Sequence, residues 1–232
     1  MKKAAFYTLG CKVNQYETEA MAELFADSGY EIKEFTEVAD VYVINTCSVT
    51  NMGDRKSRQI IRRAKKLNPN AVIAVTGCYA QTAPDEVLAI EGVNLVLGTK
   101  DRKNIVTLVE ELNTESNINH VSDIMSNHEF EELQIKQYSN RTRAFIKIQE
   151  GCNQFCSYCI IPYARGPVRS RAKDDVVREI KELAHNGFKE IILVGIHVAS
   201  YGVDLGNTTL ESLIMDVDKI DGVERIRLSS IE

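Results

Sequence analysis

Three closely spaced cysteines could hold an inorganic centre. Cys152, Cys156 and Cys159 have the spacing C-x3-C-x2-C, which places three thiolates on one short loop. A four-iron cluster held by three cysteines leaves one iron without a protein ligand, so that iron can bind a reactive molecule. Structural zinc, the alternative, takes four protein ligands, and His185 or His197 would have to supply the fourth. The spacing favours an iron–sulfur site and leaves zinc open.

A second group of three cysteines is spread over the first third of the chain. Cys11, Cys47 and Cys78 occur in "TLGC", "INTC" and "VTGC", each one or two residues after a predicted strand. The carboxyl ends of parallel strands share one edge of a sheet, where ligands bind in doubly wound α/β proteins. We therefore expect these thiols to converge there. A buried structural cysteine is the alternative for any one of them.

The elements that would position this second group alternate between short apolar runs and amphipathic stretches. The runs are typical of strands and the stretches of helices, such as 16–29. This alternation predicts βα units around a parallel sheet, a Rossmann-like α/β domain over 1–112. The predicted strands cover 4–9, 41–46, 71–76 and 93–98.

The remainder of the chain contains a polar segment and a second α/β region. Residues 113–140 are rich in Asn and Ser, which predicts a linker with a short hairpin. From 141 to 232 the alternation resumes, with predicted strands at 144–149, 190–195 and 225–230 and helices at 174–187 and 209–217. An αβ barrel cannot close on three strands. The expected fold of this region is therefore the first half of a (βα) barrel, in a chain that looks truncated.

Composition limits the cellular setting. The chain has 232 residues and a net charge of −5. The apolar run that follows the two N-terminal lysines is too short for a signal peptide, and no span long enough for a membrane is present. We expect a cytoplasmic protein without membrane association. Six cysteines in that reducing compartment are more typical of metal ligands than of disulfides.

One segment departs from the acidic balance of the chain. Between residues 51 and 70, seven basic residues accompany Asp54 alone. Arg55 and Arg58 begin this segment soon after Cys47, which favours contact with phosphate. A solvated helix face is the alternative.

Several motifs together resemble those of a known family. "GCNQFCSYCIIP" after a predicted strand resembles the radical S-adenosylmethionine signature, and "TLGCKVNQYE", "INTCSVTNMGDRKSRQ" and "TGCYAQ" resemble the N-terminal domain of methylthiotransferases. "PYARGPVRSR" and "GIHVASYG" continue the pattern. The chain is thus similar to the radical S-adenosylmethionine methylthiotransferase family. Two short stretches, Lys12-Val13-Asn14 after Cys11 and Gly195-Ile196-His197, are most similar to the branch that acts on threonylcarbamoyladenosine in tRNA.

The resemblance implies an enzyme and its cofactors. Cys152, Cys156 and Cys159 would bind one [4Fe-4S] cluster and S-adenosylmethionine, whose reductive cleavage yields a radical that abstracts hydrogen from adenine C2. Cys11, Cys47 and Cys78 would bind a second [4Fe-4S] cluster that delivers the methylated sulfur. The implied partners are tRNA and an electron donor such as flavodoxin or ferredoxin.

Two other functions remain as alternatives. The first lies within the same class: methylthiolation of isopentenyladenosine in tRNA or of a ribosomal-protein aspartate. The second is a non-enzymatic iron–sulfur or zinc module that binds RNA. The sequence has no aromatic-rich basic surface, which gives a pure binder little support.

The resemblance also suggests roles for single residues, but it assigns no catalytic acid or base. Tyr158 would pack on the adenine of the cofactor, with a core aromatic as the alternative. Three arginines would contact the cofactor carboxylate or tRNA phosphate, with ordinary salt bridges as the alternative. These are Arg165, Arg169 and Arg171.

Two departures from the family affect what the chain can do. The Gly-Gly-Glu that holds the amino group of the cofactor in many radical enzymes is absent after the second barrel strand, and Ser229, Ser230 or Glu232 could replace it. Relatives also continue into the rest of the barrel and a C-terminal RNA-binding domain. We expect the 232 residues alone to bind clusters without efficient modification of tRNA.

Overall fold

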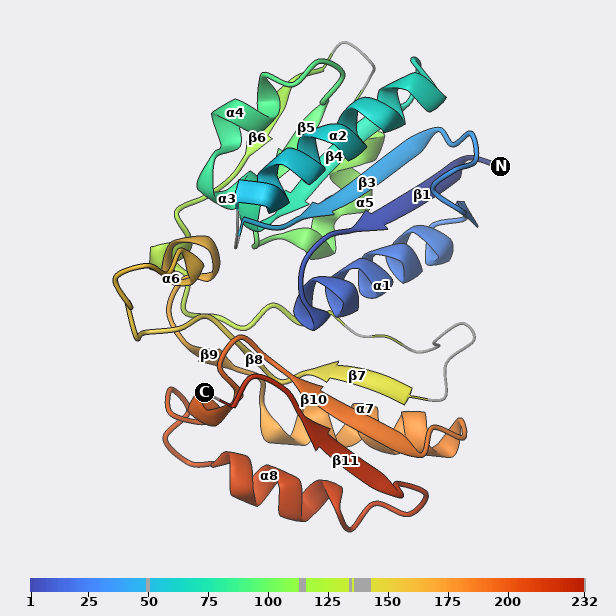
Figure 1. The fold of residues 1–232 in the computed structure, drawn as a ribbon. Helices are drawn as coiled ribbons and strands as arrows, with labels where there is room; N and C mark the ends of the chain where they lie inside the picture. The colour runs from blue at the N-terminus through green and yellow to red at the C-terminus, as the bar shows by residue number, and fades with distance from the viewer. Residues whose placement is uncertain (49–50, 113–115, 134, 136–142, 232) are drawn as a thin grey trace.

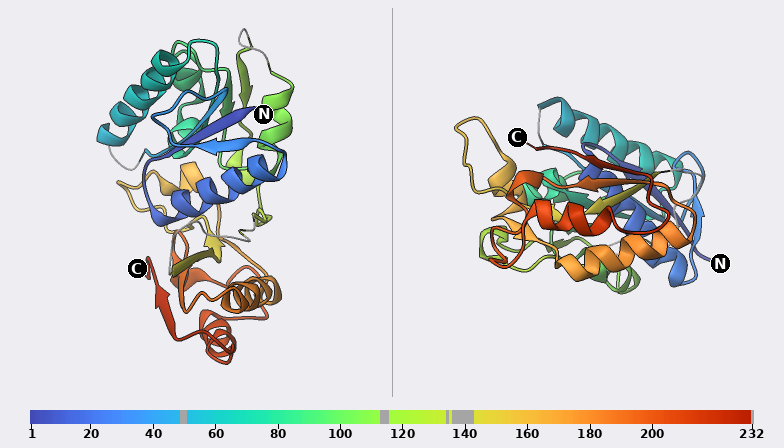
Figure 2. Two further views of the ribbon diagram at one scale, coloured as in Figure 1. Left: turned by 90° about the vertical axis from the view of Figure 1, so that its right-hand side faces the viewer. Right: turned by 90° about the horizontal axis from the view of Figure 1, so that it is seen from below.

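The computed structural model describes residues 1–48, 51–112, 116–133, 135 and 143–231. Within them, two parallel sheets lie one above the other, with helix α1 between them (Figures 1 and 2). No described helix is long and apolar enough to cross a membrane.

The first sheet has six parallel strands in the order β2-β1-β3-β4-β5-β6. Its strands are β1 (Lys3–Thr8), β2 (Glu31–Lys33), β3 (Val41–Thr46), β4 (Val72–Gly77), β5 (Leu95–Leu97) and β6 (Ile118–His120). The connecting helices are α1 (Lys12–Asp27), α2 (Asn51–Leu67), α3 (Cys78–Thr82), α4 (Pro84–Leu88), η1 (Arg102–Asn104) and α5 (Ile105–Glu110).

Helices cover both faces of this sheet. On β3, Tyr42 and Ile44 belong to a core that includes α2. The alternate residues Val41 and Val43 belong to a second core that includes α1 and α5. A strand covered on both faces is apolar throughout, which is why β3 and β4 were recognisable in the sequence.

The second sheet has three parallel strands in the order β11-β10-β7. Parallel strands that neighbour one another in chain order and are connected through helices are the start of a (βα) barrel. The elements are β7 (Arg143–Lys147), β8 (Gln149–Glu150), α6 (Ile161–Arg165), β9 (Arg169–Ser170), α7 (Lys173–His185), β10 (Glu190–Val194), η3 (Val198–Ser200), α8 (Leu210–Val217) and β11 (Arg225–Leu228). Strands β8 and β9 form a short antiparallel pair near α6.

One core joins the two sheets through α1. Tyr16 of α1 packs with Ile146 of β7 and Ile180 of α7. The Tyr16 hydroxyl also donates a hydrogen bond to the Leu133 carbonyl. Helix α1 therefore packs against the first sheet with one side and against the second sheet with the other.

The predicted fold class is confirmed, with four short strands added: β2, β6, β8 and β9. All four predicted strands of the first sheet and all three of the second are present. Strands β2 and β6 were missed because each has only three residues at a sheet edge, and β6 is exposed throughout.

Strand β6 lies in the segment that the sequence predicts as a linker. It pairs with β5, so the first sheet continues past residue 112. The described part of the segment contains this strand and η2 (Ile124–Ser126) rather than a hairpin. Leu133 and Ile135 are buried in the core shared with the second sheet. The segment is therefore packed into the fold as far as the structure describes it; residues 113–115, 134 and 136–140 lie outside that description.

Candidate functional site

The first three cysteines lie at the carboxyl ends of three neighbouring strands. Cys11 precedes α1 after β1, Cys47 follows β3, and Cys78 begins α3 directly after β4. A Cβ atom added at Gly10 would lie 3.1 Å from the Cys47 Sγ, so the β1 loop touches Cys47. The sheet register thus brings to one edge three residues that are more than 30 positions apart in sequence.

Asn14 connects the loops that carry these cysteines. Its Nδ2 donates to the carbonyls of Leu9 (2.8 Å) and Thr46 (2.9 Å), the residues that flank the β1 and β3 turns. Its Oδ1 accepts a hydrogen bond from the Cys11 Sγ at 3.6 Å. This buried amide therefore fixes the relative positions of the loops bearing Cys11 and Cys47.

Arg165 connects the third cysteine to the same group. Its Nε donates to the Cys78 Sγ at 3.3 Å, and its Nη2 donates to the Asn14 Oδ1. Burial raises the pKa of the Cys78 thiol, and the nearby guanidinium partly offsets that increase. The three cysteines share one hydrogen-bonded neighbourhood that also includes α6 of the second half.

The chemistry of these donors fits a group with several metal ions. All six cysteines of the chain are free thiols. In an iron–sulfur cluster each thiolate binds a different iron, so the sulfurs are spread more widely than around a single zinc. Cys11 is exposed and Cys78 is buried, which leaves one side of the group open.

The other three cysteines lie on the loop between β8 and α6, beyond the carboxyl end of β7. Cys152 and Cys159 are half-buried and Cys156 is exposed. The loop is tied at its base, where the Cys152 N–H donates to the Gly166 carbonyl, and within it, where the Cys159 N–H donates to the Cys156 carbonyl. These two bonds close the loop at its base and form a turn between Cys156 and Cys159, with Cys156 towards solvent.

Tyr158 points into solvent rather than into a core. Its side chain is 91% exposed, and Phe155 and Tyr163 beside it are also exposed. Phe155 and Tyr163 make an edge-to-face contact. The core alternative for Tyr158 is wrong, and its ring is free to pack on a bound molecule.

The three arginines after the loop are buried. Their exposed fractions are 0% for Arg165, 1% for Arg169 and 0% for Arg171. Arg169 donates to the carbonyls of Arg165 and Pro167, and Arg171 pairs with Glu132 and Glu179. Contact with tRNA phosphate is ruled out in this structure because solvent does not reach these guanidinium groups.

The basic residues of the segment lie along α2. Arg55 is exposed, whereas Arg58 is half-buried and donates to the Tyr79 hydroxyl at 2.9 Å. Arg55 is thus the better placed of the two for a phosphate.

A buried network of charges lies between the two sheets, and sequence reasoning missed most of it. It contains four cations and three carboxylates, each 7% exposed or less at the side chain. These are Arg102, Lys147, Arg165, Arg169, Glu17, Glu131 and Glu150.

The contacts of the network cross between the two halves. Glu17 of α1 binds Arg165 Nη1 at 2.6 Å and Arg102 of η1 at 2.5 Å. Glu150 of β8 binds Arg165 at 2.7 Å and Lys147 of β7 at 3.1 Å. Glu17 and Glu150 therefore each meet several cations, which compensates for the loss of water around them.

The sequence did contain a signal for these residues. Glu17 lies three positions after Asn14, so both are on one face of α1. Lys147 interrupts an otherwise apolar strand, and Gln149 and Glu150 directly precede the cysteine loop. A charged residue in an apolar strand indicates a buried partner.

The network predicts a stability that falls in acid. Burial raises the pKa of Glu17, but the attraction of Arg102 and Arg165 outweighs burial and holds that pKa at about 2. The cations around Glu150 likewise hold its pKa well below its usual range despite burial. Such carboxyls stabilise the folded chain above their unfolded pKa, and the gain is lost as pH falls towards the folded value.

We therefore expect the free energy of unfolding to decrease from about pH 4.5 downwards. Urea denaturation at a series of pH values would measure it. Glu17→Gln should make the free energy of unfolding depend less steeply on pH, because the variant has one fewer carboxyl to protonate. A free energy of unfolding that stays unchanged down to about pH 3 would contradict the claim that the ionised carboxylates of the network stabilise the fold.

A cavity lies beyond the carboxyl ends of β10 and β11, where the missing Gly-Gly-Glu would be expected. It has a volume of about 520 Å³ and is lined by Ile196, Leu228, Ser230 and Ile231. Ser230 has a left-handed backbone (φ 54°). Ser229 lies beside it with its Oγ 3.4 Å from the Leu193 carbonyl, and Glu232 lies outside the described residues. Of the three candidates, Ser230 lines this cavity.

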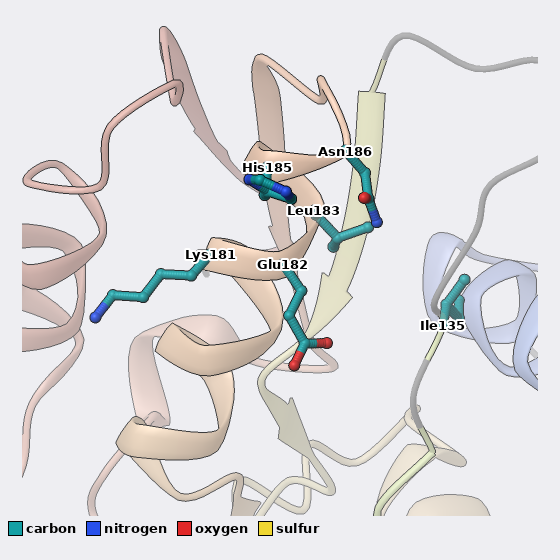
Figure 3. A pocket seen from close by; sticks show the side chains of 6 residues that line it. All are labelled: Ile135, Lys181, Glu182, Leu183, His185 and Asn186. Carbon is teal, nitrogen blue, oxygen red and sulfur yellow. The ribbon is translucent and has the colours of Figure 1, made fainter.

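The two histidines that could supply a fourth zinc ligand lie in different places. His185 lies at the end of α7 and lines a separate pocket of about 450 Å³ with Ile135 and Leu183 (Figure 3). Because α7 runs antiparallel to the strands, its last turn is at the opposite edge of the sheet from the loop. The Nδ1 of His197 contacts the Ser200 hydroxyl, and the backbone N–H of His197 donates to the Gln149 Oε1, three residues before Cys152. Recruitment of His185 as a zinc ligand is wrong.

Comparison with known proteins agrees with this two-part organisation. Residues 3–98 match the Uncharacterized protein family UPF0004, and residues 146–231 match the Radical SAM superfamily. The chain is 53% identical over 234 residues to the threonylcarbamoyladenosine tRNA methylthiotransferase MtaB of Bacillus subtilis, covering 100% of this chain and 52% of the relative. It is 36% identical to a tRNA-2-methylthio-N(6)-dimethylallyladenosine synthase of Dictyoglomus thermophilum, covering 98% of this chain and 52% of that protein.

A solved structure supports the fold independently of sequence. The radical S-adenosylmethionine methyltransferase TsrM of Kitasatospora setae superposes with a TM-score of 0.60 at 14% identity, covering 93% of this chain and 51% of that one. At this identity the likeness concerns the fold alone.

The chain joins a parallel-sheet domain to the first strands of a (βα) barrel, and a C-x3-C-x2-C loop follows the first barrel strand. These features and the family match define a protein of the Radical SAM superfamily. Membership implies a [4Fe-4S] cluster and S-adenosylmethionine as cofactors. Within the superfamily, the chain belongs to the radical S-adenosylmethionine methylthiotransferase family. It spans about half the length of the curated relatives it matches.

Proposed function

We propose that this chain is the cofactor-binding part of a methylthiotransferase that converts threonylcarbamoyladenosine in tRNA to its 2-methylthio derivative. The observation that carries the proposal is the pair of three-cysteine groups at the carboxyl edges of the two sheets, with α6 between them (Figure 1). The 53% identity to a relative with that name supports this substrate over isopentenyladenosine.

In this proposal, the loop cysteines hold the superfamily cluster. Cys152, Cys156 and Cys159 supply three thiolates, which leaves one coordination position for S-adenosylmethionine. When bound, the cluster supplies the electron that cleaves this cofactor and makes hydrogen removal from adenine C2 possible. The exposed ring of Tyr158 packs on the adenine of the cofactor. Ser230, in the cavity beyond β11, contacts its amino group.

Cys11, Cys47 and Cys78 hold a second [4Fe-4S] cluster that carries the sulfur to be transferred. Three observations support this role. The thiols share one sheet edge, Asn14 joins two of their loops, and one side of the group is open. In the product, a methylthio group replaces the hydrogen on C2, so the sulfur donor has to reach the same substrate atom as the radical.

The remaining partners follow from the substrate. Arg55 on the exposed start of α2 contacts tRNA phosphate, and a flavodoxin or ferredoxin delivers electrons. The protein acts in the cytoplasm, where tRNA is modified. The basic helix α2 would also suit a non-enzymatic RNA-binding module, but such a module leaves the two three-cysteine groups without a role.

The experiment that tests the function is nucleoside mass spectrometry of tRNA from a strain that lacks the gene for this chain. We expect 2-methylthio-threonylcarbamoyladenosine to disappear while its unmethylthiolated precursor accumulates. Loss of the methylthio group from isopentenyladenosine, or from a ribosomal-protein aspartate, would instead assign the alternative substrate. Unchanged modification at all three sites would contradict the proposal.

A further inference from the structure

Arg165 is a fully buried guanidinium whose donors join the two cysteine groups. Its Nε donates to the Cys78 sulfur at 3.3 Å. Its Nη1 donates to Glu17 at 2.6 Å and to Glu150 at 2.7 Å, two residues before Cys152. No water reaches the group, since its exposed fraction is 0%. The cation is therefore held beside the sulfur by the fold itself.

The surroundings leave a net positive charge near that sulfur. The buried network has four cations against three carboxylates, and an arginine guanidinium is protonated at any ordinary pH. Positive charge and N–H donors at a ligand sulfur stabilise the more negative, reduced state of an iron–sulfur cluster. Hydrogen bonds to the sulfurs and net charge are two of the factors that set cluster potentials.

We propose that Arg165 is a positioning residue that raises the reduction potential of the cluster at Cys11, Cys47 and Cys78. The proposal depends on the second cluster of the proposed function. The residue acts through the Nε–H···Sγ hydrogen bond to Cys78 and through its charge. Since Arg165 ends α6, which follows the Cys152 loop, the radical half of the molecule contributes directly to the electronic state of the other half.

The test uses a chain in which only the second cluster can form. In a Cys152/Cys156/Cys159→Ala background, the midpoint potential would be measured by a redox titration followed by electron paramagnetic resonance, with iron counted on the same sample. The variants are Arg165→Lys, which keeps the charge but loses the Nε donor, and Arg165→Gln, which loses both. The control is Arg171→Lys, a change at an equally buried arginine that pairs with Glu132 and Glu179 instead.

We expect the potential to become more negative in Arg165→Lys and more negative still in Arg165→Gln, with iron content unchanged. Arg171→Lys should keep the parent value. If Arg165→Gln does not fold, Arg165→Lys decides the question. An unchanged potential in Arg165→Lys with the cluster present would overturn this inference and leave the proposed function standing. Loss of the cluster from both Arg165 variants, but not from Arg171→Lys, would have the same meaning. Absence of iron from the parent background would overturn the second cluster itself, and the inference with it.

Discussion

Glu150→Ala is expected to lower the free energy of unfolding by about 3–5 kcal/mol, because it leaves the four buried cations of the network with only two carboxylates, Glu17 and Glu131. Glu150 lies within 2.7 Å of Arg165 Nη1, 3.1 Å of Lys147 Nζ and 3.5 Å of Arg102 Nη2. Urea denaturation of the wild-type and variant chains under identical anaerobic conditions would measure the loss. Glu150→Gln keeps the shape and some hydrogen bonds and should lose less.

A second glutamate provides the matched control. Glu224 also pairs with a lysine, Lys189, at 2.6 Å, but both side chains are more than half exposed. Water and salt screen such a pair, so Glu224→Ala should change stability little. If the two alanine variants lost the same amount, the buried network would not hold the two halves together as described.

Gly151→Ala is the second change with a large expected effect. Gly151 has a φ of +76°, and a Cβ atom there would lie 1.8 Å from the Pro167 carbonyl oxygen. An alanine would therefore be strained in its backbone and would collide with the segment that ties down the cysteine loop. We expect a loss of more than about 2 kcal/mol and a lower iron content at the loop, measured by denaturation and by iron analysis.

Gly187→Ala is a control that has the unfavourable backbone conformation of an alanine at positive φ but no collision of its Cβ atom. Gly187 has a φ of +90°, but a Cβ atom there has no heavy atom within 4 Å. Its variant should lose about 1 kcal/mol from the backbone conformation alone and keep full iron content. Equal losses of stability and iron in both variants would show that the contact between Gly151 and Pro167 has no importance for the loop.

The strands of both sheets and the convergence of three distant cysteines could be predicted from sequence because both depend on local patterns. Buried parallel strands are apolar and bounded by turn residues, and each cysteine of the first group follows such a strand. Their common edge then follows from parallel topology. Strands β2 and β6 escaped because three-residue edge strands have too few residues to show a pattern.

The pairings within the charge network could not be predicted, because a pattern that indicates a buried charge does not tell which residue it meets. Arg165 and Arg169 follow a cofactor loop in a short basic motif, which suggested phosphate or carboxylate recognition. In the structure they are buried against Glu17, Glu150 and backbone carbonyls. Those partners come from α1 and β8, and the pairing depends on how the two halves pack, which no local pattern encodes.

The central claim is that the chain binds two separate iron–sulfur clusters through three cysteines each. The most direct measurement is iron, sulfide and zinc content per chain after anaerobic reconstitution, for the wild type and for Cys152/Cys156/Cys159→Ala. We predict about eight irons in the wild type and about four in the variant, with matching sulfide. About one zinc per chain with little iron would contradict the claim and remove the basis for radical chemistry.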